Sequence, residues 1–221
     1  MANNSGNILI GAASMAIGVG VPTVGVESLV DSIKSAATGS PKDFRGWVNG
    51  LPRDSGSELD SSGVTFYATG FTTTGVEVNY MPDYQDAVVD QLLDAARIFK
   101  VKMSVHVKTA FSEATLPNLV YVWDMADNLF SSAGGYDEVY LAPGELGDHP
   151  QERVLAFAGQ APLVSGDSRQ RLYVATRAIS MQASAHALKR DGVTEFPVEF
   201  RLLPDGNSSF SAYGKIVDQS T

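Results

Sequence analysis

Strict alternation of apolar and polar side chains marks residues 100–108, which read Lys100-Val101-Lys102-Met103-Ser104-Val105-His106-Val107-Lys108. A period of two residues is typical of a half-buried β-strand, because successive side chains point to opposite faces of a sheet. The pattern therefore predicts a strand whose valines and methionine face a core. Its lysines, serine and histidine then face water or a neighbouring subunit.

A second alternation runs through residues 195–202, and it places Phe196, Val198, Phe200 and Leu202 on the inward side. Pro197 falls on the outward side, where proline indicates a sheet edge or a bulge. Further segments are rich in Val, Tyr, Phe and Thr and are bounded by Gly, Pro or Asp. These are residues 63–68, 75–80, 139–141, 153–159 and 171–181. The chain is therefore predicted to be mainly β.

One helix is well marked in the sequence. Thr115 is placed to cap it, and Pro117 is tolerated in a first helical turn because that position needs no N–H donor. The residues that recur at helical spacing are Leu116, Leu119, Val120, Trp123 and Ala126, whereas Asn118, Asp124 and Asp127 lie elsewhere on the helical wheel. The apolar stripe is expected to pack on the sheet.

Residues 84–99 also show helical spacing, so local pattern alone predicts a second helix there.

The 221 residues contain no evident internal linker, and we expect a single domain spanning residues 1–221. Two long loops are predicted, at about residues 37–62 and 131–151, and loops of this length usually carry a function. The first contains Phe44, Arg45, Trp47 and Arg53, which are residue types enriched at protein interfaces. We interpret these four residues as a subunit contact.

Composition excludes several classes of function. The chain has no cysteine, so it has neither a disulfide framework nor a thiolate metal site, and its 25 acidic residues against 16 basic ones give a net charge of −9. Such a surface repels nucleic acid.

Residues 8–26 carry no charge, but five interruptions by glycine and proline favour a strand, a turn and a loop over a membrane span or an export signal. A soluble protein without membrane partners is expected.

The titratable residues show no catalytic or metal-binding spacing. His106, His149 and His186 have no metal-ligand spacing, and Gly18-Val19-Gly20 completes no phosphate loop. The acids Asp83, Asp86, Asp90 and Asp94 form the densest cluster, and we interpret them as a solvated face, with a divalent-cation site as the alternative. The loop acids Asp137, Glu138, Glu145 and Asp148 are interpreted in the same way. The sequence therefore predicts no enzyme, no cofactor, no catalytic residue and no metal ligand.

Several segments carry short motifs in a fixed order. Residues 70–84 read G-x-T-x-x-G-V-x-V-x-Y-x-P-x-Y, and Val88-Val89-Asp90-Gln91 follows them. Residues 102–107 then lead into Ser112-Glu113-Ala114-Thr115-Leu116-Pro117-Asn118-Leu119. In this order the segments resemble the major tail tube proteins of bacteriophages with long non-contractile tails. Residues 6–11 are similar to the short first strand of that family, residues 102–119 to its strand entering its prominent helix, and the segments 177–179, 196–200 and 203–205 to its closing strands.

The resemblance implies a β-sandwich or open β-barrel with one flanking helix and long interface loops. It also implies that residues 84–99 run as strand or bulged strand, which overrules the helical pattern there. Six copies are expected to form rings that stack into a tail tube, assembled in the host cytoplasm and carried by the virion. The implied partners are other copies of the chain, the tape measure protein, the tail terminator and the distal tail protein, with non-specific passage of genomic DNA.

The bore of such a tube must pass DNA without holding it, so an acidic or neutral wall is expected. Glu77, Asn79, Met81 and Asp83 share one side of a strand and are the candidates for this wall, although the same positions equally suit a solvent face.

Two alternatives to a tail tube subunit stay open. One is a tail terminator or capsid-decorating β-sandwich; the other is a carbohydrate-binding or adhesive β-sandwich that uses Trp47, Tyr136 and Tyr140 as a sugar platform.

Overall fold

The computed structural model describes residues 13–39, 42–52, 56–59, 62–87, 97–113, 115–142, 149–161, 169–181, 195–209 and 212–219. The strands are β1 (Ser14–Val19), β2 (Ser57–Leu59), β3 (Val64–Ala68), β4 (Thr72–Ala87), β5 (Arg97–Phe111), β6 (Phe130–Ala133), β7 (Tyr136–Val139), β8 (Arg153–Gln160), β9 (Gln170–Ser180), β10 (Phe196–Leu202) and β11 (Lys215–Asp218). The helices are α1 (Val26–Ala36), α2 (Phe44–Asn49), α3 (Leu116–Val122) and the 3₁₀ turn η2 (Asp127–Leu129). Strand residues far outnumber helical ones, which confirms the mainly-β prediction.

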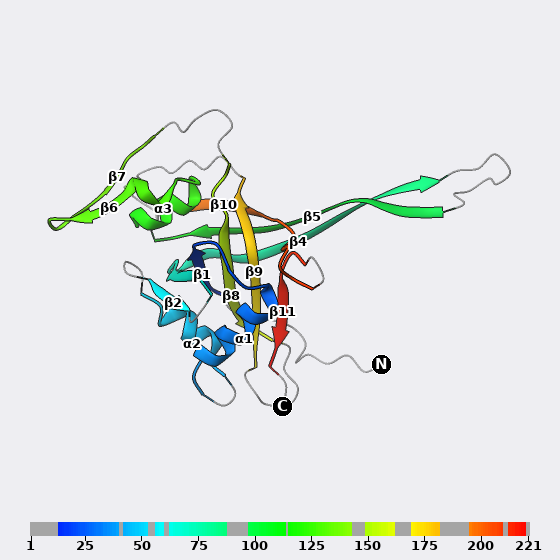
Figure 1. Ribbon diagram of the computed structural model, residues 1–221, viewed down its shortest axis with the longest axis horizontal. Coiled ribbons are helices and arrows are strands. Elements are labelled where there is room, and N and C mark those ends of the chain that lie inside the picture. Colours follow the sequence, from blue (N-terminus) through cyan, green and yellow to red (C-terminus); the bar gives the residue numbers. More distant parts are fainter. Residues whose placement is uncertain are drawn as a thin grey trace.

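One antiparallel sheet holds the described strands except β6 and β7, in the order β2-β3-β1-β8-β9-β10-β5-β4 with β11 beside β9. Strand β10 pairs with β9 only at Phe200–Leu202, but it pairs with β5 along its whole length. Strand β11 pairs with β9 at Arg171–Val174. Because β10 leaves β9 after three residue pairs, the sheet bends there and its two halves cross one another (Figure 1).

The two halves of the sheet enclose one buried cluster. Ile17 of β1 and Leu155 of β8 belong to it from one half, and Val107 of β5 and Phe200 of β10 from the other. The rings of Phe157 and Tyr173 stack at its side, with centroids 4.6 Å apart. This is the arrangement of a sandwich made from a single sheet, because side chains from facing halves meet in one core.

A second cluster lies on the opposite face of β1, β8 and β9. Ala16 belongs to this second cluster, whereas its neighbours Met15 and Ile17 belong to the first, as strand alternation requires. Helices α1 and α2 cover this face with Leu29, Val30, Ile33 and Phe44. The molecule therefore has a helical layer, a central half-sheet and a crossing half-sheet (Figure 1).

The two alternating segments behave differently along their lengths. In β10, every second residue from Phe196 to Leu202 is buried, as predicted, and Pro197 lies beyond the short stretch that pairs with β9. In β5, Val105 and Val107 are buried, but Val101 is 48% exposed. The prediction that Val101 faces a core is wrong, because this end of β5 has left the folded core (Figure 1).

Helix α3 begins at Leu116 with Pro117 in its first turn, as predicted, but it ends at Val122. Thr115 occupies the cap position without a side-chain cap bond. Asn118 was predicted to lie outside the apolar stripe, but it is buried. Its Nδ2 donates to the carbonyls of Thr69 at 3.0 Å and Glu113 at 2.9 Å. A polar side chain with two backbone partners is stable in the interior.

The predicted loops contain regular structure. The first holds α2 and β2, and the Asp43 carboxylate caps α2 by accepting from the Gly46 N–H at 2.8 Å. The second holds the β6–β7 hairpin, whose turn is made by Gly134 and Gly135 with φ of 66° and 84°. Positive φ at both central residues favours this tight hairpin turn. Helix α1 was not predicted, so the described residues contain three α-helices where the sequence indicated one.

Residues 84–87 and 97–99 are extended, as the resemblance implied, and they pair with one another in the register of β4 and β5. The local helical pattern therefore fails at both ends of this segment. The middle of the segment, residues 88–96, lies outside the described residues.

Candidate functional site

Strands β4 and β5 form a hairpin that projects far beyond both halves of the sheet (Figure 1). We define the arm as residues 80–87 of β4 and 97–103 of β5. These strands contain 16 and 15 residues, against seven for β10, which pairs with β5 only from Val105 onward. The base of the arm still borders the core, where the Tyr213 hydroxyl donates to the Met103 carbonyl at 3.4 Å. Beyond Met103 the arm consists of two strands alone, without a third strand or a covering layer among the described residues.

Pairing in the arm contains one irregularity. Asp83 lies opposite Lys102 and Tyr84 opposite Lys100, so Val101 is an extra residue in β5. Such a bulge increases the local twist of a strand pair. Across it, Tyr80, Tyr84, Lys100 and Ile98 share one side of the ribbon, because residues that pair across strands point to the same side.

This side of the arm exposes two tyrosines and an isoleucine to solvent, together with Lys100 and, opposite Ile98, Asp86. Tyr80, Tyr84 and Ile98 are 62%, 59% and 63% exposed. The ammonium group of Lys100 lies 5.4 Å from the Tyr80 ring centroid and donates to its hydroxyl at 3.1 Å, and this bond raises the pKa of Lys100. Met81 and Phe99, also exposed, belong to the other side. An isolated two-stranded hairpin is at best marginally stable in water. The arm therefore has the composition of a surface that another molecule covers.

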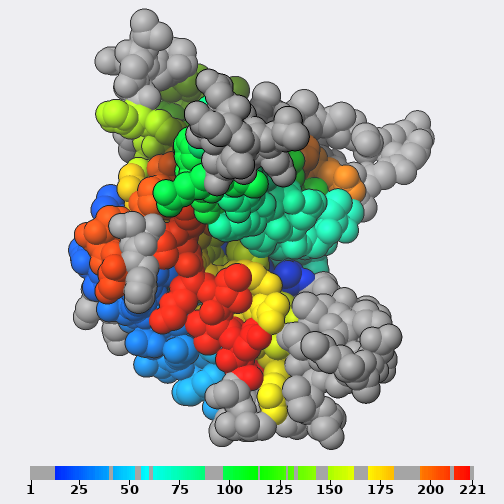
Figure 2. Space-filling model, turned by 90° about the vertical axis from the view of Figure 1, so that its right-hand side faces the viewer, coloured from blue at the N-terminus to red at the C-terminus, as the bar shows by residue number. Residues whose placement is uncertain are grey.

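An apolar groove continues from the arm toward the sheet. It has a volume of about 430 Å³. Its lining includes Val78 and Tyr80 of β4, Phe157 of β8, Tyr173 of β9, Tyr213 just before β11 and Ile216 within β11. Figure 2 looks at the molecule from the side toward which the arm projects, with β4 above and with β9 (yellow) and β11 (red) below. The groove lies where the two halves of the sheet separate.

The four wall candidates lie together on the other side of β4. Glu77, Asn79, Met81 and Asp83 pair with Lys108, His106, Ser104 and Lys102, respectively. On β10, the Glu199 carboxylate accepts from Lys108 at 3.2 Å and lies 2.7 Å from the His106 ring. Carboxylates and lysines therefore lie side by side on this side of β4 and β5. Its charge is mixed, so these strands do not present an acidic wall. The side faces away from the buried cluster, because Val107 faces into it.

The four residues predicted as one subunit contact are separated in the structure. Phe44 is only 3% exposed and belongs to the core beneath α2, so the fold excludes it from the surface. The backbone N–H of Arg45 donates to Gln170 at 2.8 Å, and its side chain lines a different cavity with Phe71 and Asn49. Arg53 lies outside the described residues. Of the three described residues, only Trp47 lines the pocket between α1, α2 and β2.

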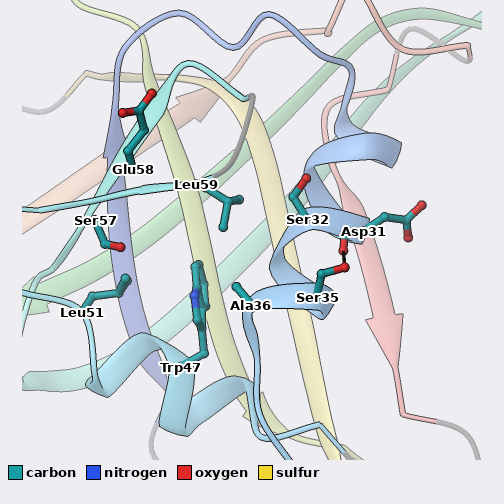
Figure 3. Close-up of a pocket in the computed structure, with 9 residues that line it drawn as sticks. All are labelled: Asp31, Ser32, Ser35, Ala36, Trp47, Leu51, Ser57, Glu58 and Leu59. Carbon is teal, nitrogen blue, oxygen red and sulfur yellow. Dashed lines mark hydrogen bonds between the residues drawn. The ribbon is translucent and has the colours of Figure 1, made fainter.

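The pocket in Figure 3 lies between α1, α2 and β2 and has a volume of about 540 Å³. The indole of Trp47 meets Phe66 edge to face at 5.5 Å, and Leu51, Leu59 and Ala36 complete the apolar lining. The polar lining residues are Asp31, Ser32 and Ser35 on α1 and Ser57 and Glu58 on β2. Asp31 and Glu58 lie on opposite sides of the pocket (Figure 3).

Trp47, Tyr136 and Tyr140 do not form a common sugar platform. Tyr136 belongs to the β6–β7 hairpin and Tyr140 follows it, and this hairpin lies apart from α2 (Figure 1). Each tyrosine is well exposed. The fold therefore separates Trp47 from the two tyrosines within one subunit.

The acidic residues that cluster in the sequence do not form a cluster among the described residues. Asp90 and Asp94 lie outside the described residues, as do Glu145, Asp148 and His186, while Asp83 and Asp86 point to opposite sides of β4. Among the described residues, no group of three or more His, Asp or Glu side chains is arranged to hold a metal ion. None of the described helices has both the length and the apolar character needed to cross a bilayer.

Sequence reasoning missed the exposed apolar side of the arm. The available signal was the length of the two predicted strands, together with apolar residues on both sides of the strand at Ile98-Phe99-Lys100-Val101.

Comparison with protein-family models and with curated proteins gives no match to this chain.

Proposed function

We propose that this protein is a structural subunit that polymerises into a phage tail tube, with six copies in each ring and rings stacked along the axis. The observation that carries the proposal is the arm, because Tyr80, Tyr84 and Ile98 stay exposed on a ribbon that has no covering layer among the described residues. Exposed apolar surface of this kind marks sites of protein association. A contact between an arm and a different surface of the next copy is heterologous, and such contacts repeat without closing.

The free edge of β4 supports the same proposal. Strand β4 pairs only with β5 among the described strands, so its outer backbone N–H and C=O groups are left for another partner. An edge this long promotes aggregation unless it is covered or paired. Pairing between copies would satisfy these groups and make a continuous wall. The order of segments that resembles the tail tube family agrees with this assembly.

In this proposal the tube forms in the host cytoplasm around the tape measure protein, between the distal tail protein and the tail terminator. The tube then remains in the virion and genomic DNA passes through it. The balanced charges on the Glu77 side of β4 suit a wall that neither binds nor strongly repels DNA.

Electron microscopy of the purified protein tests the proposal. We expect hollow filaments of constant bore above a threshold concentration, or after addition of distal tail protein as an initiator, and sedimentation should show polymers in equilibrium with free subunits. Single closed rings or trimers would support the terminator or decoration alternative. A monomer at every concentration, with and without the initiator, would end the proposal.

A further inference from the structure

The pocket of Figure 3 is lined by more hydrogen-bond acceptors than donors. Ser32 and Ser35 donate their protons to the helix carbonyls of Ser28 at 3.1 Å and Asp31 at 2.9 Å, so each hydroxyl offers only lone pairs to the pocket. The carboxylates of Asp31 and Glu58 add further acceptors. Among the side chains of the described lining residues, the donors that remain are the indole N–H and the Ser57 hydroxyl, so this lining favours a ligand that donates.

The charges of the two carboxylates are not equivalent. Asp31 already pairs with Lys34 at 3.1 Å, whereas Glu58 forms no ion pair with another described residue. The indole of Trp47 and the Glu58 carboxylate line the same pocket, and each attracts a cation, since the face of tryptophan is the best of the aromatic rings for this contact. The apolar lining of Leu59 and Ala36 suits the aliphatic stem of a long basic side chain.

A sugar suits this pocket less well. Sugar hydroxyls accept as well as donate, and most of the lining groups cannot supply protons to them. The guanidinium group of arginine has five donors and no acceptor, and it keeps its charge at all physiological pH values. The chemistry of the pocket therefore favours an arginine side chain.

The arm carries such a side chain at its outer end. Arg97 is exposed and lies opposite Ala87, while Lys100 is held by Tyr80 and Lys102 lies opposite Asp83. Among the described arm cations, Arg97 is thus the one that neither lies opposite a carboxylate nor donates to a tyrosine. Because the arm projects away from α1 and α2, Arg97 reaches a pocket of this kind only on another molecule (Figure 1).

We propose that Arg97 on the arm of one copy binds in the Trp47 pocket of the next copy, with its guanidinium group against the indole and the Glu58 carboxylate. This inference rests on the proposed self-assembly. The contact joins two different surfaces of the same chain, so it repeats from copy to copy. It also explains why an aromatic side chain lies in a half-open pocket flanked by acids.

Exchange of the two charges tests the contact. We expect Glu58→Arg and Arg97→Glu each to raise the critical concentration for polymerisation roughly tenfold, and the combined variant to return it to within about threefold of the natural protein. Both residues are exposed, so circular dichroism should show unchanged folding. Glu138→Arg on β7 is the matched control and should polymerise normally. Single variants that polymerise like the natural protein, or a combined variant no better than the singles, would overturn the inference.

Cross-linking gives an independent readout, because the natural chain has no cysteine. A mixture of Glu58→Cys and Arg97→Cys subunits should form disulfide-linked dimers under mild oxidation, whereas a mixture of Glu138→Cys and Arg97→Cys should not. Polymers without the 58–97 cross-link would refute this contact and leave the tube proposal intact. Absence of any polymer from the natural protein would refute both.

Discussion

Asp205 and Val26 are joined by a hydrogen bond although 179 residues separate them in the chain. The buried carboxylate accepts from the Val26 N–H at 3.0 Å with one oxygen and from the Asn207 N–H at 2.9 Å with the other. Val26 is the first residue of α1, and the residue before it, Gly25, has no side chain with which to cap. Asp205 therefore supplies the cap of α1 from the far end of the chain.

Replacement of Asp205 by alanine should lower the free energy of unfolding by about 2 kcal/mol, because it removes a helix cap and leaves the buried Val26 N–H without an acceptor. Urea unfolding followed by circular dichroism measures this change. Asp137→Ala on the exposed β6–β7 hairpin is the control, and we expect it to change stability by less than about 0.5 kcal/mol. Equal midpoints for the two variants would contradict the capping role.

Arg153 provides a second stability prediction. Its side chain is 2% exposed, donates to the Asp127 carboxylate at 2.5 and 2.7 Å and to the Met125 carbonyl at 2.9 Å, and lies over the Tyr121 ring. Arg153→Ala should cost about 3 kcal/mol, since it empties a buried site beside the Tyr121 ring and removes the hydrogen bonds to Asp127 and Met125. Arg171→Ala breaks the more exposed pair with Asp218 and should cost about 1 kcal/mol or less. Similar costs for the two variants would contradict the importance of burial.

Stability should fall in acid. The Arg171 hydrogen bond lowers the pKa of Asp218 below its ordinary value of 3.8, and the Arg177 hydrogen bond lowers the pKa of Glu152 below 4.5. A carboxylate with a lowered folded pKa stabilises the fold above its unfolded pKa, and this contribution is lost as the pH falls through the folded value. Burial raises the pKa of Asp124, which acts in the opposite direction.

The slope of unfolding free energy against pH, measured between about pH 5 and pH 2, checks this balance. The combined Asp218→Asn and Glu152→Gln variant should show a shallower slope than the natural protein. Asp137→Asn is the control and should leave the slope unchanged. A steeper slope in the combined variant would show that other carboxylates control acid stability.

The sequence predicted the fold where local pattern and tertiary structure agree. Strand β10 is one example, because both of its faces keep the same surroundings from Phe196 to Leu202. It failed at α1, since the cap comes from Asp205, and at Val101, since alternation gives the side of a strand without showing where that strand leaves the core. Phe44 was assigned to a surface because a loop was expected around it, whereas α2 turns its ring into the core. Which surfaces lie together depends on the bend between β9 and β10, which no local pattern encodes.

Introduction of a charge on the apolar side of the arm should block assembly. Ile98→Lys places an ammonium group at a residue that is 63% exposed in the free subunit, so folding should be unaffected, and burial of that charge against a neighbour should be unfavourable. We expect sedimentation to show subunits without polymers at concentrations where the natural protein polymerises. Val21→Lys changes another exposed apolar residue, 82% accessible and outside the arm, and should polymerise normally. Normal polymers from Ile98→Lys would remove the arm from the contact.

A change of charge on the Glu77 side of β4 tests whether this side lines the bore. Glu77 and Asp83 lie opposite Lys108 and Lys102, so replacement of both acids by lysine creates a row of four lysines on adjacent strands. If this row faces the bore, duplex DNA should be retained through its phosphates, and the retention should weaken steeply as salt rises. Tubes should still form, and DNA ejection from assembled particles should slow. Asp137→Lys with Glu138→Lys makes the same change of charge on the β6–β7 hairpin and should leave ejection unchanged. Normal ejection with lysine at positions 77 and 83 would place this side of β4 on the exterior of the tube.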